Sequence, residues 1–145
     1  MTVQAPSSEK NRSATYIVSG GASRLGAAFV RRLSAAGNNV IIGDSDESAG
    51  AAIASEFGDS VVFCLCDVRR DEDLAGLVQC ASDVFGGLDG IVNNAVSYLD
   101  NGIASSRADW HAAFDVTLFG GAVLLAKALP LLTESPSAAV VNVSS

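Results

Sequence analysis

The sequence is poor in the side chains that most often bind transition metals. It contains one histidine and three cysteines, Cys64, Cys66 and Cys80, among 145 residues. Cys64 and Cys66 fall in an apolar run, where alternate residues share one face of a strand. A structural zinc site needs four nitrogen or sulfur ligands. We therefore predict no metal site and three buried, reduced thiols of the kind found in cytoplasmic proteins.

Basic residues are also scarce. The 9 Lys and Arg are outnumbered by 16 Asp and Glu, which gives a formal net charge of −7 at pH 7. Proteins that bind nucleic acid need a basic surface to neutralise phosphates. The charge balance therefore argues against nucleic acid as a partner.

Long hydrophobic runs are absent as well. No uninterrupted apolar run approaches the roughly 18 residues of a membrane-spanning helix, so we predict no membrane span. Residues 1–12 are polar and include Glu9, Lys10 and Arg12, which is unlike the apolar core of a secretory signal. We expect residues 1–13 to form a flexible tail and the protein to be cytoplasmic.

Short apolar runs alternate with helical patterns from residue 14 onwards. Strands that are apolar throughout, with helices between them, indicate a parallel sheet covered on both faces. We therefore predict an α/β fold, a doubly wound parallel sheet in three layers that forms one domain over residues 14–145. The five predicted strands are residues 14–19, 39–44, 60–66, 88–93 and 138–143.

The longest helical pattern covers residues 109–132. Apolar or small residues recur along one face of this predicted helix, which we interpret as part of the core or as a subunit interface. The residues of this face are Trp110, Phe114, Leu118, Gly121, Leu125 and Ala128.

A glycine-rich turn, Ser19–Gly26, follows the first predicted strand. Gly20 and Gly26 are compatible with a tight strand-to-helix turn alone, but such a turn also presents backbone N–H groups and a helix dipole to a pyrophosphate. The second predicted strand ends in Asp44. A carboxylate there accepts hydrogen bonds from ribose hydroxyls and repels a 2′-phosphate. Together these features predict a nicotinamide dinucleotide site that prefers NAD to NADP.

From residue 14 onwards the chain resembles the short-chain dehydrogenase/reductase family. Ser19–Gly26 is similar to the family's Thr-Gly-x-x-x-Gly-Ile/Leu-Gly turn, and Asp67-Val68 to its Asp-Val pair. Asn93-Asn94-Ala95-Val96 resembles the Asn-Asn-Ala-Gly signature, and Val141–Ser145 resembles the end of the strand that carries the catalytic serine. The resemblance implies a Rossmann-type fold, a nicotinamide cofactor and a small-molecule alcohol or ketone substrate.

The resemblance also implies roles for individual residues. Ser145 would hydrogen-bond the substrate oxygen, and Thr117 stands where the family has a catalytic asparagine. Members of the family form dimers or tetramers, so we expect a homodimer or homotetramer. The residues expected to bind the cofactor are Gly20, Ser23, Arg24, Leu25, Gly26, Asp44, Asp67, Val68, Asn94 and Ala95.

Several positions depart from the family pattern. The two tyrosines, Tyr16 and Tyr98, both lack a lysine four residues later, so these 145 residues do not contain the family's Tyr-x-x-x-Lys pair. Arg24 replaces the middle glycine of the turn, Val96 replaces a glycine, and Thr117 replaces the asparagine. A guanidinium at position 24 can bind a phosphate, although its side chain also hinders close approach of the backbone.

These departures leave two hypotheses. The first is an NAD-dependent dehydrogenase whose Tyr-Lys part lies beyond this stretch, so that the Rossmann domain is incomplete at its C-terminus and the stretch alone is inactive. The second is a non-catalytic nucleotide-binding pseudo-enzyme or a partner subunit with the same fold. The presence of Asp44, Asp67 and Ser145 favours the first hypothesis.

Overall fold

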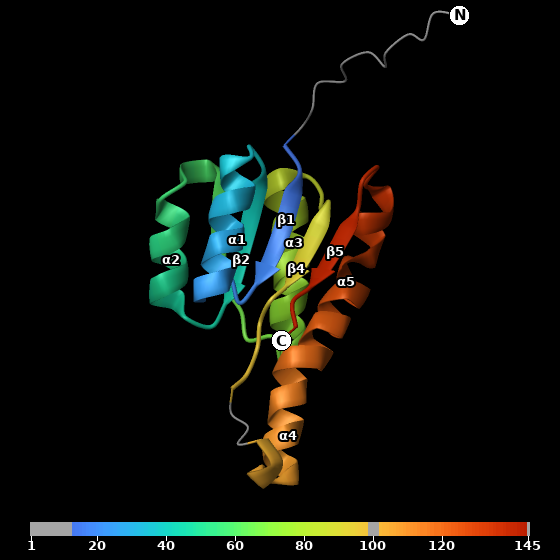
Figure 1. Cartoon of the computed structure of the whole chain (residues 1–145). Helices are drawn as coiled ribbons and strands as arrows, with labels where there is room; N and C mark the ends of the chain where they lie inside the picture. Colours follow the sequence, from blue (N-terminus) through green and yellow to red (C-terminus); the bar gives the residue numbers. More distant parts are fainter. Residues whose placement is uncertain (1–12, 99–101, 145) are drawn as a thin grey trace, which may run out of the picture.

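The computed structural model describes residues 13–98 and 102–144, so the predicted tail at residues 1–12 lies outside the described range. At its centre is a sheet of parallel strands in the order β3-β2-β1-β4-β5 (Figure 1). The fold prediction is confirmed, and each strand begins and ends within two residues of its predicted bounds. The strands are β1 (Thr15–Ser19), β2 (Asn39–Asp44), β3 (Val61–Leu65), β4 (Gly90–Asn93) and β5 (Ala139–Asn142).

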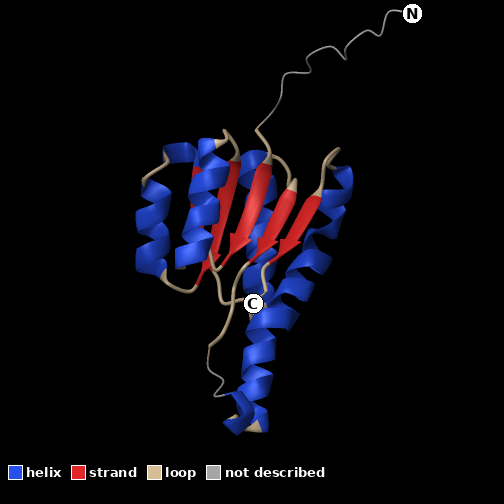
Figure 2. Ribbon diagram, in the orientation of Figure 1, coloured by secondary structure: helices blue, strands red, loops and turns tan. Residues whose placement is uncertain are grey.

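Helices cover both faces of the sheet, and this produces the three layers (Figure 2). Neighbouring strand residues alternate between the faces. Val18 and Ile42 pack in one core cluster, and Ile17 and Ile41 pack in the other. Helices α1 (Arg24–Ala35) and α2 (Glu47–Ser55) contribute to the first cluster, whereas α3 (Asp71–Phe85) and α5 (Gly120–Glu134) contribute to the second. Two short 3₁₀ turns lie at Gly58–Ser60 and Gly102–Ala104.

The strand order places a topological switch between β1 and β4. From β1 the chain continues through β2 to β3 in one direction, and then returns to the other side of β1 to form β4 and β5. Loops that leave β1 and β4 therefore diverge to opposite faces of the sheet. In open parallel sheets this divergence opens a crevice beyond the carboxyl ends of the strands.

The predicted long helix is divided by a π-helical turn. It consists of α4 (Arg107–Phe114), the π-helical segment Asp115–Phe119 and α5. A π-turn contains more residues than an α-turn, so it rotates the residues that follow it relative to those before it. As a core face the predicted stripe is therefore wrong, because α5 buries Gly120, Leu124, Ala128 and Leu132. Only Ala128 belongs to both sets. The alternative role of the predicted stripe as a subunit interface stays a prediction.

The amino-terminal half of this helix extends beyond the sheet (Figure 1). Trp110 is 40% exposed, Phe114 48% and Leu118 55%, so this part of the predicted face does not pack in the core. The helix Arg107–Glu134 has 28 residues, and an 18-residue window in it has a mean hydropathy of 1.8, so by length and composition alone it is apolar enough to cross a membrane. The predicted absence of a membrane span therefore does not follow from hydrophobicity alone, and it stays a prediction. The buried stripe of α5 packs on α3 and the sheet, as the core helix of an α/β domain does.

Candidate functional site

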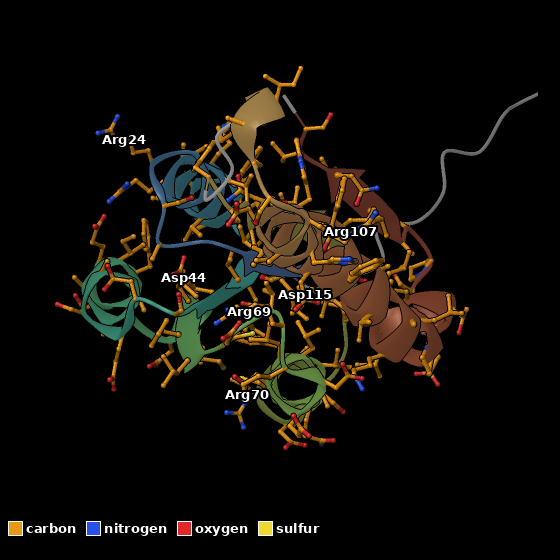
Figure 3. The ribbon with its side chains drawn as sticks, turned by 90° about the horizontal axis from the view of Figure 1, so that it is seen from below. Arg24, Asp44, Arg69, Arg70, Arg107 and Asp115 are labelled. Atoms are coloured by element: carbon orange, nitrogen blue, oxygen red, sulfur yellow. The ribbon has the colours of Figure 1, made fainter. Side chains whose placement is uncertain are left out.

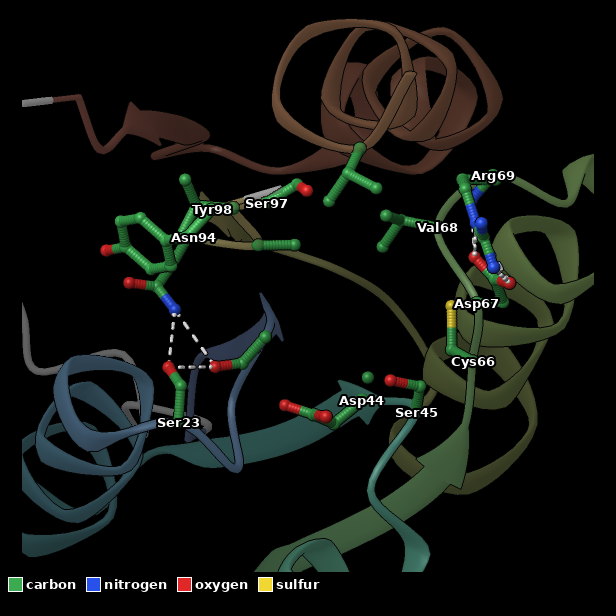
Figure 4. A pocket seen from close by; sticks show the side chains of 15 residues that line it. Ser23, Asp44, Ser45, Cys66, Asp67, Val68, Arg69, Asn94, Ser97 and Tyr98 are labelled. Atoms are coloured by element: carbon green, nitrogen blue, oxygen red, sulfur yellow. Dashed lines mark hydrogen bonds and ion pairs between the residues drawn. The ribbon is translucent and has the colours of Figure 1, made fainter. Parts of the chain in front are cut away.

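Two neighbouring cavities open at the carboxyl ends of the strands, beside the switch between β1 and β4. The first has a volume of 480 Å³ and includes Gly20, Asp44, Asp67 and Asn94 in its wall (Figure 4). The second has a volume of 800 Å³ and includes Arg24, Leu25, Thr117 and Ser144. Ser23, Asn94, Val96 and Tyr98 line both cavities, so the two form one continuous cleft.

The glycine-rich turn forms the floor of this cleft, between β1 and α1. Gly20 has a φ of +64°, and a Cβ at this position would lie 2.8 Å from Ala95 Cα. A Cβ on Gly26 would overlap the carbonyl oxygen of Gly20. Both positions therefore require glycine for steric reasons. Ser23 caps α1, since its Oγ accepts the Gly26 N–H at 3.3 Å and donates to the Gly20 carbonyl oxygen at 2.7 Å.

Arg24, which occupies the family's middle glycine position, is the first residue of α1. Positive φ angles among the described residues occur at glycines alone, so the arginine introduces no backbone strain. Its side chain points outward from the start of α1 (Figure 3), and Arg24 and the half-exposed Leu25 form part of the wall of the second cavity. The replacement therefore leaves the turn's backbone intact.

Asp44 is located at the end of β2 and contacts the same turn. Its Oδ2 accepts the Ala22 N–H at 2.9 Å, and its Oδ1 accepts the Asp46 N–H at 3.0 Å. Figure 4 shows the carboxylate facing the first cavity. The sequence motif predicted a ribose-binding carboxylate, but it did not predict that Asp44 also holds the turn in place.

Asp67, in the loop after β3, forms a bidentate ion pair with Arg69. Arg69 Nη2 lies 2.5 Å from Asp67 Oδ2, and Nε lies 2.9 Å from Oδ1. This hydrogen bonding from Arg69 lowers the pKa of the Asp67 carboxyl below its ordinary value. Both residues line the first cavity, as does Val68. The sequence analysis did not predict a role for Arg69. A basic residue two positions after a predicted binding carboxylate could have indicated this ion pair.

Asn94 fastens the loop after β4 to the turn after β1. Its Nδ2 donates to the Gly20 carbonyl oxygen at 2.9 Å and to Ser23 Oγ at 3.2 Å. Its own N–H and that of Ala95 donate to Ser19 Oγ at 3.1 and 3.3 Å. Asn94 is 7% exposed. The structure thus assigns Asn94 a structural role, and its predicted contact with a cofactor stays a prediction.

Thr117 lies in the π-helical segment and contacts the same loop from the other side. Its Oγ1 accepts the Ser97 N–H at 3.3 Å, and it lines the second cavity together with Val143 and Ser144. The segment from Ala95 to Ser97 is therefore held between the glycine-rich turn and the long helix. Ser145, the predicted catalytic serine, lies outside the described residues.

The three cysteines are free thiols. Cys66 is 2% exposed and lines the first cavity, whereas Cys64 and Cys80 are partly buried beside the core. Burial raises the pKa of Cys64 and of Cys66 to about 12. The Cys66 thiol at the cavity wall therefore stays protonated near neutral pH, which makes it a poor nucleophile.

Comparison with known proteins gives one consistent result. The family model for short chain dehydrogenases matches residues 14–145. L-fucose dehydrogenase from Bos taurus is 38% identical over 131 residues, which are 89% of this chain and 48% of that protein. The 3-alpha-(or 20-beta)-hydroxysteroid dehydrogenase from Mycobacterium tuberculosis is 33% identical over 131 residues, again 89% of this chain and 50% of that protein. The chain thus spans about half the length of these relatives.

A solved structure agrees with these relatives. A short-chain dehydrogenase from Streptomyces avermitilis superposes with a TM-score of 0.84 and 26% sequence identity, over 92% of this chain and 49% of that one. The strand order, the turn after β1 and the family match therefore lead to the same conclusion. The chain belongs to the short-chain dehydrogenase family.

Proposed function

We propose that the full-length protein is an NAD-dependent dehydrogenase that transfers a hydride between the nicotinamide ring and an alcohol or carbonyl carbon. Proteins of this family are oxidoreductases that use nicotinamide cofactors. The observation that carries the proposal is the arrangement of the cleft: the glycine-rich turn, Asp44 and Asp67 line one cavity at the carboxyl ends of three strands. The amino-terminal N–H groups of α1 open beside this turn and favour an anion such as pyrophosphate.

The first cavity is the proposed site for the adenosine half of the cofactor. Asp44 is positioned to accept hydrogen bonds from the ribose hydroxyls, while Asp67 and Val68 form the wall for the base. A 2′-phosphate would meet the negative charge of Asp44. The one cation in the wall of this cavity, among the described residues, is Arg69, and its charge is paired with Asp67. These charges favour NAD over NADP.

The second cavity is the proposed site for the nicotinamide half and the substrate. The bound cofactor supplies the hydride acceptor or donor. Val96 and Tyr98 form one wall, and Thr117 forms part of another. In this proposal Ser145 donates a hydrogen bond to the substrate oxygen. Thr117 holds a water of the proton-transfer path through its hydroxyl. These 145 residues do not contain the family's Tyr-x-x-x-Lys pair, so the proposed reaction requires a general acid that is not among them.

A turnover assay tests the proposal. The full-length protein is incubated with NAD and a panel of secondary alcohols and sugars that includes a hydroxysteroid and L-fucose, and NADH is followed by its absorbance. We expect NADH formation with at least one substrate and its loss in the Ser145→Ala variant. If the protein binds NAD but reduces none with any alcohol, and oxidises no NADH with the matching ketones, the second hypothesis of a non-catalytic nucleotide-binding protein or partner subunit is the correct one.

We also propose that the protein assembles as a homodimer or homotetramer through α4. Trp110 and Phe114 stack with ring centroids 6.0 Å apart, and both side chains are about half exposed, as is Leu118. Exposed apolar patches of this kind mark association surfaces. Light scattering should give a dimer or larger for the full-length protein and a smaller species for Trp110→Glu. An unchanged monomeric mass for both would reject this assembly.

A further inference from the structure

The ion pair between Arg69 and Asp67 changes what the first cavity offers to a nucleotide base. Asp67 Oδ1 accepts the Arg69 backbone N–H at 3.0 Å and Nε at 2.9 Å, and Oδ2 accepts Nη2 at 2.5 Å and Nε at 3.1 Å. A carboxylate has about four acceptor positions. Arg69 therefore occupies most of the acceptor capacity of Asp67, and its charge cancels that of the carboxylate.

The guanidinium at the same time brings donors to the cavity wall. A guanidinium carries five N–H donors on three nitrogens, and the bonds from the Arg69 guanidinium to Asp67 come from Nε and Nη2. The Nη1 donors take no part in these bonds, and Arg69 lines the rim of the cavity. Figure 4 shows the arginine and aspartate side chains joined at this rim. A base that reaches this wall meets the Asp67 carboxylate, whose acceptor positions Arg69 largely fills, next to a guanidinium donor.

The fold of the loop does not depend on this ion pair. The Asp67 N–H donates to Asp73 Oδ2 at 3.0 Å, and the Arg70 N–H donates to the Asp67 carbonyl oxygen at 2.9 Å. The side chains of Asp67 and Arg69 remain 28% and 52% exposed. Since the backbone is held by other contacts and the pair faces the cavity, the position of Arg69 is better explained by ligand selection than by support of the loop.

We propose that Arg69 sets the base selectivity of the dinucleotide site, so that the site accepts a purine with a 6-oxo group nearly as well as one with a 6-amino group. The 6-amino group of adenine donates to Asp67, whereas the 6-oxo group of hypoxanthine accepts from the Arg69 guanidinium. Without Arg69, the free carboxylate favours the amino group and repels the oxo group. This inference rests on the proposed dinucleotide-binding function.

The test measures dissociation constants of the full-length protein for NAD and for nicotinamide hypoxanthine dinucleotide, its 6-oxo analogue. We expect the two constants of the wild type to agree within about threefold. In Arg69→Leu the ratio should shift about tenfold or more in favour of NAD, since a hydrogen bond to a charged group is strong. Arg69→Lys keeps the positive charge but loses the bidentate guanidinium. Its ratio of dissociation constants should lie between those of the wild type and Arg69→Leu.

Arg70→Leu is the matched control, because it removes the same charge one residue away. Arg70 is outside the cavity wall and forms an exposed ion pair with Asp73 at 3.6 Å. Arg70→Leu should therefore keep the wild-type ratio of the dissociation constants for the two dinucleotides. The inference is overturned if Arg69→Leu leaves the ratio unchanged or weakens both dinucleotides equally, which would indicate stacking or a structural role. If the wild type binds neither dinucleotide, the proposed function itself fails, and the inference fails with it.

Discussion

The two ends of the sheet both carry aspartates next to strand termini, but the side chains are used differently. At the amino end, Asp89 is 3% exposed, and it accepts the Thr15 N–H at 2.8 Å and the Ser135 hydroxyl at 2.7 Å. At the carboxyl end, Asp44 and Asp67 also accept N–H groups, but both face a cavity. The comparison teaches that a carboxylate's function depends on which of its acceptor positions remain open to a ligand.

The largest expected effect comes from Gly26→Ala at the carboxyl end. The added Cβ would overlap the Gly20 carbonyl oxygen, so the turn must rearrange. We expect a loss of about 3 kcal/mol or more in the free energy of unfolding and no detectable dinucleotide binding. Denaturant unfolding and a binding titration of the full-length protein measure the two quantities.

Gly76→Ala is the control for this variant. Gly76 lies inside α3, and a Cβ there would have no atom within 4 Å. This substitution should therefore stabilise the protein by roughly 0.5–1 kcal/mol through helix propensity. Wild-type stability and binding in Gly26→Ala would show that the turn does not need the glycine.

An intermediate effect is expected from Asp89→Ala at the amino end. The variant leaves the buried Thr15 N–H without its carboxylate acceptor, which should lower the free energy of unfolding by about 2 kcal/mol. Because Asp89 lies at the other end of the sheet, the dissociation constant for NAD should change less than about twofold, below 0.4 kcal/mol. A large loss of NAD affinity with unchanged stability would reverse the roles assigned to the two ends.

The smallest effect concerns pH and the Asp67–Arg69 pair. The folded pKa of Asp67 is lowered by Arg69, so the pair stabilises the fold above the ordinary aspartate pKa of about 3.9. That contribution disappears as the pH falls through the lowered folded pKa. Arg69→Leu should therefore be slightly less stable than the wild type at pH 7, and the two should converge as the pH falls through the lowered folded pKa of Asp67. A difference that stays constant across this range would contradict the assigned cause.

The strands and the position of the cleft could be predicted from the sequence, because the signals for them are local. Alternation of apolar runs with helical spacing predicted each strand, and the motifs at Ser19–Gly26, Asp44 and Asp67 all fell at carboxyl strand ends. Parallel strands bring such ends together whatever their separation in the chain. The location of the cleft could therefore be predicted without coordinates.

The parts that could not be predicted depend on side-chain direction and helix phase. The Asn94 N–H donates to the Ser19 hydroxyl, 75 residues away in the sequence, and no local pattern specifies that contact. The π-helical segment Asp115–Phe119 changes which residues of the long helix face the core, yet its sequence is compatible with a regular α-helix. The ion pair between Asp67 and Arg69 depends on the rotamer of the Arg69 side chain, which the sequence alone does not determine.

The central claim is that the cleft binds NAD and that Asp44 gives it preference over NADP. Titration of the full-length protein with NADH and NADPH, followed by nicotinamide fluorescence, tests this most directly. We expect NADH to bind at least about tenfold more tightly, a difference of about 1.4 kcal/mol. Asp44→Asn keeps an acceptor for the Ala22 N–H but removes the charge. In this variant the dissociation constants for NADH and NADPH should become more similar. Tighter binding of NADPH to the wild type, or binding of neither, would contradict the account.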